Sequence, residues 1–348
     1  MSAMKEMRIV VAGGAGYIGS HVCVELLKAG HKALVIDNFA NSSPVALDRI
    51  AEIAGAGADL LRADLADPAD EKRIIEAVTA FRPDGAVHLA GLKAVGESVA
   101  EPVRYYSVNL PATFTLIRAL EAAEARMIVF SSSATVYGDL NQSPVDETGA
   151  TGPTNPYGRT KLFIEDILKD LARSDPRWKV SNLRYFNPVG AHPSGRIGED
   201  PNGVPNNLFP FIAQVAVGRL PRLKVFGDDY PTRDGSGVRD YIHVVDLAAG
   251  HVAALNFLTR AKAPGAVVHN LGTGRGVSVF EAIAAFKRAS NRDIPFDVAP
   301  RREGDIAEIY ARPDRANKEL GWRATKTLED MCADHWRWQS ANPNGFRD

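Results

Sequence analysis

Tyr157 and Lys161 are the pair of side chains whose types and spacing most directly suggest chemistry. They lie in the segment NPYGRTK at residues 155–161, and Pro156 is typical of the first position of a helix. On a helix, a spacing of four residues brings both side chains to one face. A phenol has a pKa of about 10, so a base near pH 7 needs a shift of about 3 units, or roughly 4 kcal/mol. One positive charge about 4 Å away supplies roughly that much at an effective dielectric near 20. We therefore predict that Tyr157 accepts a proton beside Lys161.

A glycine-rich segment, AGGAGYIG at residues 12–19, joins a predicted strand to a predicted helix that runs to about residue 29. Gly13, Gly16 and Gly19 let the backbone turn sharply and approach a pyrophosphate. The free amides at the start of the helix can then bind the phosphate oxygens. The pattern predicts a dinucleotide-binding turn, although a tight strand-to-helix turn could use the same glycines.

Asp37 ends the second predicted strand, 18 residues after Gly19. At this place a carboxylate can accept hydrogen bonds from both ribose hydroxyls of an adenosine. Asp37 would repel a 2′-phosphate, and residues 38–41 contain no Arg or Lys to bind one. The segment therefore favours NAD over NADP. An oxidised nicotinamide would add a second positive charge to that of Lys161 near Tyr157. Asp64, after the third predicted strand, is either a contact to the adenine amino group or an ordinary loop aspartate.

A run of serines, SSSATVYG at residues 131–138, follows the fifth predicted strand. Ligands of doubly wound sheets bind at the carboxyl ends of the strands. One serine hydroxyl there can share the proton that a substrate loses.

Short β-branched runs alternate with longer helical patterns through the first half of the chain, which is typical of a parallel sheet built from βαβ units. We predict an α/β fold, a Rossmann-like doubly wound parallel sheet, over residues 1–187. Pro- and Gly-rich turns from 188 to 205 predict a smaller mixed α/β substrate domain over residues 188–348. Some chain is expected to cross back into the first domain at about 238–272. The predicted strands are 8–12, 33–37, 59–62, 85–90, 127–131 and 180–185.

Composition excludes several other classes of protein. The 348 residues carry a formal net charge of -1, which gives no long-range attraction for nucleic acid or an anionic membrane. Cys23 and Cys332 are far apart, and His88, His192 and His243 are scattered, so neither a disulfide framework nor a metal site is predicted. No apolar run of about 18 residues is present, and no signal-peptide pattern precedes the first strand, so we expect a cytoplasmic protein.

Together these segments resemble the extended short-chain dehydrogenase/reductase family, which combines a glycine loop, a strand-end serine and a Tyr-x-x-x-Lys helix. Within this family, the resemblance extends to the branch that inverts carbon 4 of UDP-hexoses, and it covers nearly the whole chain. The segments that carry it are GLKAVGES at 91–98, SSSATVYG at 131–138, LRYFNPVG at 183–190 and VRDYIH at 238–243. The resemblance implies an epimerase that interconverts UDP-galactose and UDP-glucose with tightly bound NAD.

The resemblance also implies catalytic roles for the matching positions. Tyr157 takes the proton of the 4-hydroxyl, Ser133 is its hydrogen-bonding helper, and Lys161 holds the nicotinamide ribose. Hydride moves from carbon 4 to NAD, the 4-keto sugar turns about its link to UDP, and the hydride returns to the other face. We therefore expect weak contacts to the sugar and strong contacts to the nucleotides.

Binding residues follow from the same resemblance. The implied cofactor site comprises Gly13, Gly16, Tyr17, Ile18, Gly19, Asp37, Asn38, Asn41, Asp64, Leu65, Leu89, Ala90, Gly91, Lys93, Asn109, Ser131, Tyr157, Lys161 and Phe186. The implied substrate site comprises Lys93, Ser133, Tyr157, Asn187, Asn207, Leu208, Phe226, Arg239, Arg302 and Asp305. Arginines can bind a diphosphate and Asp305 a ribose diol, although each could equally be an ordinary surface charge.

Two positions depart from the family pattern. Ala12 stands where many relatives carry a threonine before the glycine loop, which removes at most one hydrogen bond. Ile309 lies at a pocket position where relatives carry either a bulky aromatic or a small residue. Because Ile is intermediate in size, 2-acetamido sugars stay open as substrates.

Three alternatives remain at this point. A nucleotide-sugar 4,6-dehydratase would carry an Asp-Glu pair where this chain has Ala134 and Thr135. A 4-epimerase of UDP-pentoses or UDP-glucuronate would use the same catalytic residues. A non-catalytic NAD-sensing module would usually lack the tyrosine or the lysine. The resemblance also implies a homodimer formed through helices at about 103–121 and 156–171.

Overall fold

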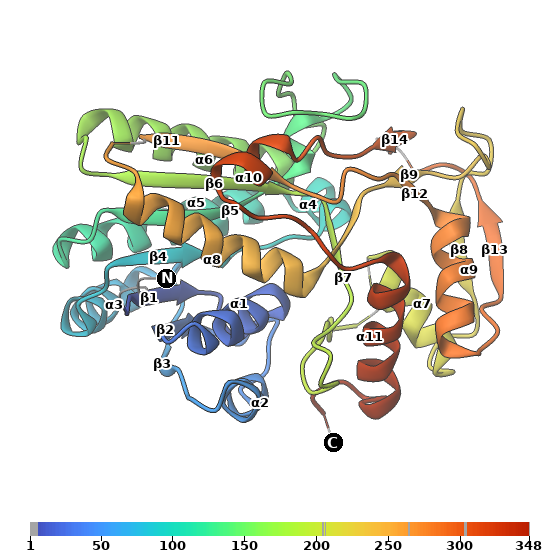
Figure 1. Ribbon diagram of the computed structural model, residues 1–348, viewed down its shortest axis with the longest axis horizontal. Helices are drawn as coiled ribbons and strands as arrows, with labels where there is room; N and C mark the ends of the chain where they lie inside the picture. The colour runs from blue at the N-terminus through green and yellow to red at the C-terminus, as the bar shows by residue number, and fades with distance from the viewer. Residues whose placement is uncertain (1–5, 204, 206, 264, 303–304, 348) are drawn as a thin grey trace.

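A parallel seven-stranded sheet forms the centre of the computed structural model, which describes residues 6–203, 205, 207–263, 265–302 and 305–347 (Figure 1). The strand order is β11-β6-β5-β4-β1-β2-β3, so the direction of winding reverses between β1 and β4. This order confirms the predicted Rossmann-like doubly wound α/β fold. The strands are β1 (Arg8–Ala12), β2 (Lys32–Asp37), β3 (Asp59–Arg62), β4 (Gly85–His88), β5 (Met127–Ser133), β6 (Lys179–Tyr185) and β11 (Ala266–Leu271).

Alternating side chains of the strands fill two separate cores, one on each face of the sheet. Ile9 and Val11 of β1 belong to one core, and Val10 and Ala12 to the other. Strands buried on both faces read as continuous apolar runs, which is why they could be located in the sequence. The first core is covered by α1 (Tyr17–Lys28), α2 (Val45–Ala54) and α8 (Val244–Arg260), and the second by α3 (Pro68–Phe81), α5 (Pro102–Ala122) and α6 (Pro156–Ser174).

The number of strands predicted for this sheet is wrong by one. Six strands were expected, and β11 adds a seventh beside β6, in register from Ala266 against Val180 to Leu271 against Tyr185. Sequence periodicity is local and cannot show that a strand from the second half of the chain pairs with one from the first half. The ends of the six predicted strands lie within two residues of the observed ends.

The remaining strands form three small sheets beside the large one, on the right in Figure 1. They pair β10 (Tyr241–His243) with β7 (Asn187–Val189), β13 (Phe296–Ala299) with β8 (Leu223–Phe226), and β9 (Val238–Arg239) with both β12 (Val277–Ser278) and β14 (Glu308–Ile309). A third core packs under them, with Phe209 and Phe286 at its centre. The helices here are α7 (Leu208–Ala216), α9 (Val279–Ser290) and α11 (Leu328–Ala341), whereas α10 (Asp314–Glu319) packs beside β11 and its Ala316 belongs to the first core.

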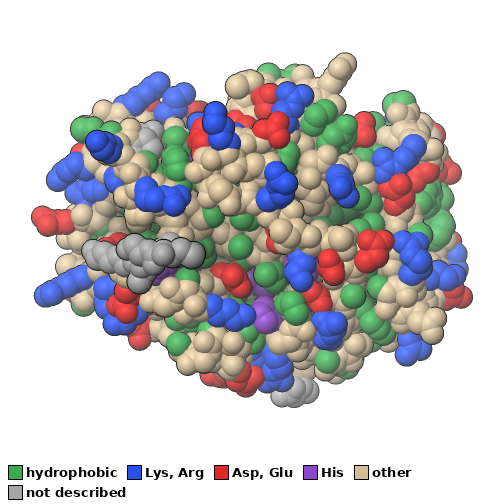
Figure 2. Space-filling view, viewed as in Figure 1, with side chains coloured by type: hydrophobic (Ala, Val, Ile, Leu, Met, Phe, Trp, Pro, Cys, Tyr) green, Lys and Arg blue, Asp and Glu red, His purple; other side chains and the backbone are tan. Residues whose placement is uncertain are grey.

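Charged side chains of both signs are spread over the face shown in Figure 2, without a region of one sign. Within the described part of the chain, no helix combines the length and the hydropathy that crossing a bilayer requires.

Candidate active site

The glycine turn between β1 and α1 lies at the point where the winding of the sheet reverses. A Cβ on Gly13 would come within 2.8 Å of the Ala90 backbone nitrogen, and one on Gly19 would collide with the carbonyl oxygen of Gly13. At Gly16 a Cβ would meet only that carbonyl oxygen, at 3.4 Å, so this side of the turn is open. No side chain caps α1. The first amides of the helix are therefore available to an anion, and the turn fits the pyrophosphate of a dinucleotide.

Asp37 is 8% exposed at the end of β2 and organises the neighbouring loop. Its carboxylate accepts hydrogen bonds from the backbone nitrogens of Ala15, at 2.9 Å, and Phe39, at 2.9 Å, and from the Ser42 hydroxyl at 2.7 Å. A carboxylate offers about four acceptor positions, so capacity remains for a ribose hydroxyl. The buried negative charge fits NAD and opposes a 2′-phosphate.

Asn38 and Asp64 lie together beside this loop, with Asn38 Nδ2 donating to Asp64 Oδ2 at 3.0 Å. Asp64 also accepts from the Ala66 nitrogen at 2.8 Å. The structure thus brings together two residues that the resemblance assigns to the adenosine end. Leu65, next to Asp64, is buried, whereas Asn41 is exposed at the rim.

The loop after β4 is held by hydrogen bonds to the end of β1 and to α5. The backbone nitrogens of Leu89 and Ala90 each donate to the Ala12 carbonyl at 2.9 Å. Asn109, on α5, accepts from the Leu92 nitrogen at 2.8 Å and donates to Thr160 Oγ1 on α6 at 3.0 Å. Asn109 therefore joins the loop of the predicted cofactor site to the helix that carries Tyr157.

The catalytic pair begins α6 and is buried at the carboxyl end of β5. Asn155 caps the helix by accepting from the Gly158 nitrogen at 2.8 Å. Tyr157 is 7% and Lys161 5% exposed. Lys161 Nζ donates to the Ser131 carbonyl at 2.8 Å and lies 5.7 Å from the centre of the Tyr157 ring. The lysine is thus held on the strand, near the ring but without a direct bond to the phenol.

In the chain alone the pKa of Tyr157 is raised, whereas the predicted lowering needs the charges of both Lys161 and an oxidised nicotinamide. Burial raises the pKa of Tyr157 to about 12, and hydrogen bonding with Ser133 lowers it by a smaller amount. Burial also lowers the pKa of Lys161 to about 8. Burial outweighs the hydrogen bond with Ser133, and the Lys161 ammonium donates to the Ser131 carbonyl and not to the phenol. The chain alone does not activate the phenol, so the remaining positive charge must arrive with a ligand.

Thr135 is a feature of the site that the sequence interpretation missed. It lies in the short 3₁₀ turn η1 (Ala134–Tyr137) directly after β5. Its backbone nitrogen donates to Ser133 Oγ at 3.2 Å and its hydroxyl donates to the same oxygen at 3.0 Å. With both lone pairs engaged, Ser133 has its own proton left to donate. The segment SAT at residues 133–135 contains a signal for this contact, because a hydroxyl two residues after a strand-end serine can bond back to it.

Predicted substrate residues from the second half of the chain lie together in pairs. Arg239, on β9, and Asp305, in the loop before β14, form an ion pair of 3.5 Å. The Arg302 guanidinium lies 3.9 Å from the centre of the Phe226 ring, at the end of β8. The first pair lies on the sheet of β12, β9 and β14, and the second lies at the end of the separate sheet of β13 and β8. Asn187 and Leu208 lie apart from them in the chain, at the starts of β7 and α7.

Glu199 is a second residue that the sequence interpretation missed. Its side chain is 4% exposed and accepts from Lys93 Nζ at 3.0 Å and from Asn207 Nδ2 at 3.2 Å. It therefore connects two predicted substrate residues from distant parts of the chain. The segment GED gave no signal because it lies within a Pro- and Gly-rich stretch that reads as turns.

Apolar residues close the site beside the catalytic turn. Phe186 and Ile309 belong to one buried cluster with Ala134 and Val145, and Ile309 is 9% exposed. The Phe186 nitrogen donates to the Leu271 carbonyl at 3.2 Å, which ties this cluster to the edge of the large sheet. Ile309 thus faces the same cluster as the cofactor residue Phe186.

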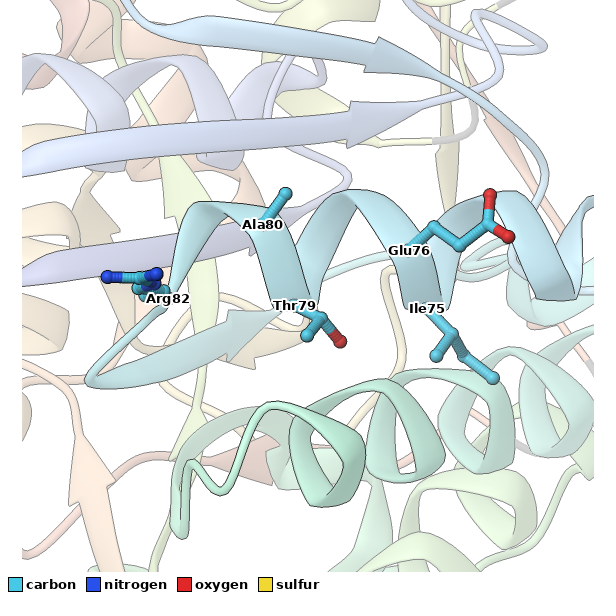
Figure 3. A pocket seen from close by; sticks show the side chains of 5 residues that line it. All are labelled: Ile75, Glu76, Thr79, Ala80 and Arg82. Atoms are coloured by element: carbon cyan, nitrogen blue, oxygen red, sulfur yellow. The ribbon is translucent and has the colours of Figure 1, made fainter.

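A separate depression lies on α3, where Glu76, Thr79 and Arg82 are among its lining residues (Figure 3). It shares no residue with the predicted site and brings no catalytic pair together. Among the described residues, no group of three or more His, Cys, Asp or Glu side chains is arranged to hold a metal ion.

A doubly wound sheet with a dinucleotide-type glycine turn and a buried Tyr-Lys pair is the arrangement of the short-chain dehydrogenases/reductases. The family model described as GDP-mannose 4,6 dehydratase matches residues 10–335. A UDP-glucose 4-epimerase of Bacillus subtilis is 56% identical over 342 residues, covering 98% of this chain and 99% of that protein. The chain belongs to the UDP-glucose 4-epimerase family, within the NAD-dependent epimerases and dehydratases.

Two further relatives extend the comparison. The crystal structure of UDP-glucose 4-epimerase from Bifidobacterium longum, in complex with NAD+ and UDP, superposes with a TM-score of 0.93 at 50% identity and covers 97% of this chain and 99% of that one. A bifunctional UDP-glucose 4-epimerase and UDP-xylose 4-epimerase of Arabidopsis thaliana is 51% identical, covering 100% of this chain and 99% of that protein. The expected family, fold and kind of cofactor site are confirmed.

Proposed function

We propose that this protein is an NAD-dependent epimerase that inverts carbon 4 of UDP-galactose and UDP-glucose. The observation that carries the proposal is the buried Tyr157–Lys161 pair beside Ser133, at the carboxyl edge of a sheet whose glycine turn fits a dinucleotide. NAD, when bound, takes the hydride from carbon 4 and returns it to the opposite face of a 4-keto sugar.

Tyr157 is assigned the proton of the 4-hydroxyl. Because burial holds its pKa at about 12 in the chain alone, the phenol keeps its own proton until a ligand brings positive charge. Lys161 adds to that charge from 5.7 Å, and at pH 7 it is largely protonated since its pKa is about 8. Ser133, fixed as a donor by Thr135, hydrogen-bonds the reacting oxygens while the 4-hydroxyl proton passes to the phenolate of Tyr157. The base is thus active only in the loaded site.

The substrate groups are assigned to the two ends of the UDP-sugar. Arg239 and Arg302 bind the diphosphate, which arginines recognise by paired hydrogen bonds, and Asp305 binds the uridine ribose. Asn187, Asn207, Leu208 and Phe226 complete the nucleotide side, and Lys93 lies between diphosphate and sugar. Few polar groups are left for the hexose, so the keto sugar can turn while UDP stays bound.

The cofactor assignment follows the predicted list from Gly13 to Phe186 and stands as part of the proposal. So does the division of the chain at residue 187 into an NAD-binding unit and a UDP-sugar-binding unit. The proposal includes the crossing of the chain back into the first unit at about 238–272, and α8 and β11, which lie in this stretch and pack on the large sheet, support it. We assign the activity to the cytoplasm, where Cys23 and Cys332, both buried and unpaired, stay reduced.

A second candidate is the same epimerisation on another UDP-sugar. The Arabidopsis relative carries UDP-xylose in its name, and Ile309 at the edge of the catalytic cluster is intermediate in size. The dehydratase named in the family model is less well supported. Ala134 and Thr135 supply no carboxylate for dehydration, and Thr135 is instead bonded to Ser133.

We also propose that two copies of the chain pair through the outer faces of α4 (Val95–Ala100), α5 and α6. Val99 and Val103 are 63% and 74% exposed there, and Phe114 and Phe163 are also exposed. The Phe163 ring lies 6.0 Å from Tyr106, which makes a contiguous apolar surface across two helices. A second copy is the occupant that would cover this surface symmetrically. Phe163→Glu should give a monomer in light scattering, whereas an unchanged mass, or a monomeric parent, excludes this interface.

The test is conversion of UDP-galactose to UDP-glucose by the purified protein without added cofactor, together with identification of the nucleotide released on denaturation. Turnover with NAD released supports both reaction and cofactor. Activity only with UDP-xylose, UDP-glucuronate or UDP-N-acetylhexosamine keeps the mechanism and replaces the substrate. Absence of turnover on all of them overturns the proposal in favour of an NAD-sensing module.

A further inference from the structure

The C-terminal residues 342–347 leave α11 and run back to the adenosine side of the predicted cofactor site. In Figure 1 the chain ends on the same lower side as α2. The Phe346 nitrogen donates to Asp200 Oδ2 at 2.9 Å, and Gly345, at φ 72°, has no room for a Cβ against the same carboxylate. We call residues 342–347 the C-terminal strap.

Arg347 continues these contacts onto the next loop. Its guanidinium lies 3.9 Å from Asp200 Oδ1 and donates to Asn202 Oδ1 at 3.4 Å. Asn202 in turn donates from Nδ2 to the Ala40 carbonyl at 3.1 Å and from its backbone nitrogen to Asn41 Oδ1 at 3.5 Å. The strap is therefore joined through Asp200 and Asn202 to the loop that follows Asp37.

A tilted pair of aromatic rings anchors the strap to α11. The Phe346 ring lies 4.9 Å from the ring of Trp338, which is fully buried. Arg49 of α2 lies over both rings, at 5.1 Å from Phe346 and 5.6 Å from Trp338. Arg49 also donates to Asn342 Oδ1 at 2.8 Å. The anchor thus connects α11, the strap and the helix that begins just after the adenosine loop.

We propose that the C-terminal strap controls the release of NAD, by holding residues 199–202 over the adenosine loop. This inference rests on the proposed function, because it takes residues 38–41 as the adenosine site. Phe346 and Arg347 are positioning residues, since they act through Asp200 and Asn202 and touch none of the predicted catalytic groups. With the strap lifted, Asp200 and Asn202 lose their contacts to Phe346 and Arg347, while Glu199 keeps its hydrogen bond from Trp338 of α11. The adenosine end is then the first part of the cofactor to be uncovered.

Release of NAD is the readout, measured on protein purified with its cofactor and mixed with an NAD-hydrolysing enzyme that destroys each molecule as it leaves. Phe346→Ala removes the stacked ring and should speed release about tenfold, which is the equivalent of about 1.4 kcal/mol and within the range for a lost aromatic pair. Arg347→Ala should speed it by a smaller factor. Activity assayed with saturating NAD should stay that of the parent.

Two controls separate this role from a general loss of stability. Phe346→Tyr keeps the ring and should release NAD at the parent rate. Arg177→Ala removes an exposed arginine that, like Arg347, pairs with an aspartate, here Asp175 at 2.7 Å, but on the far side of the molecule. It should leave release unchanged. Oxidative labelling read by mass spectrometry distinguishes Trp338 from the other tryptophans of the chain, so it reports whether Trp338 has become exposed and the strap has lifted.

A chain truncated after Ala341 lacks the whole strap and should release NAD fastest. If this truncated chain does not fold, the point variants alone decide the test. Equal release rates in parent and Phe346→Ala, with Trp338 exposed in the variant, overturn the proposal. If the parent protein carries no NAD when purified and binds none when it is added, the proposed function fails instead. The two failures are therefore distinguishable.

Discussion

The cofactor half and the substrate half of the site are built in opposite ways. Asp37, Tyr157 and Lys161 are each less than a tenth exposed. Arg302 and Asp305 are exposed, and Arg239, 19% exposed in its side chain, is paired with Asp305 at 3.5 Å. Buried side chains are held in position before a ligand arrives. Exposed side chains must first give up an ion-pair partner or bound water in order to contact the ligand. The difference suits an enzyme that keeps one ligand through many turnovers and must release the other in each.

The comparison is tested most strongly at Tyr157, the buried group assigned to proton transfer. Tyr157→Phe removes one hydroxyl from a ring that stays packed, so kcat should fall by about 10²- to 10⁴-fold, the usual contribution of a general base. Bound NAD and the melting temperature should change little. Tyr106→Phe, which removes a hydroxyl on the outer face of α5, serves as the matched control. Full activity of Tyr157→Phe would remove the tyrosine from its role.

The second test concerns the rigidity of the cofactor half. In Gly19→Ala the new Cβ meets the Gly13 carbonyl oxygen, which belongs to the backbone and cannot rotate away. Overpacking of this kind costs about 1–3 kcal/mol, so the variant should melt earlier and carry less NAD per chain. Gly57→Ala is the control, since nothing lies within 4 Å of a Cβ there. Equal NAD content in the two variants would show that the turn is not held as rigidly as the structure indicates.

The cofactor half was also the more predictable half from sequence. Its glycines, Asp37 and the Tyr157–Lys161 pair lie at short, fixed offsets from strands and helices, and local periodicity locates those elements. Asn155 before Pro156 even identifies the helix start, since it caps α6 in the structure. Local patterns succeed where the chemistry is carried by one strand, one turn or one helix.

Contacts between residues far apart in the chain could not be predicted from local patterns. The seventh strand β11 and the buried Glu199 depend on partners far away in the chain, namely β6 and Lys93. The surroundings of the Tyr157–Lys161 pair show a related limit. Spacing places Lys161 beside the tyrosine, but only the fold shows that the ammonium binds the Ser131 carbonyl and that burial dominates.

The substrate half gives a smaller expected effect. Arg302→Ala should raise KM for the UDP-sugar about tenfold to a hundredfold by removing a diphosphate contact, while kcat and bound NAD stay near the parent values. The adjacent Arg301→Ala is a close control, because Arg301 is an exposed arginine stacked on Tyr230 and paired with Asp229. If Arg302→Ala also lost bound NAD, the cofactor half and the substrate half would not act independently.

The smallest effect is a pH signature of burial in the catalytic pair. The folded pKa of Lys161 is about 8, below its ordinary value of 10.5, so between these values the unfolded chain binds more protons than the folded one. Stability must therefore rise with pH across this window, and it is lost as pH falls toward 8. Tyr157 acts in the opposite sense only above about pH 10, because its pKa is raised to about 12.

Comparing urea unfolding of the parent with Lys161→Met from pH 8 to 10 isolates the lysine, since other groups titrate alike in both. The parent should gain about 1–2 kcal/mol relative to the variant. If the stability of parent and variant changed with pH in the same way, water would reach Lys161, and the cofactor half would be less shielded from solvent than its burial in the structure indicates.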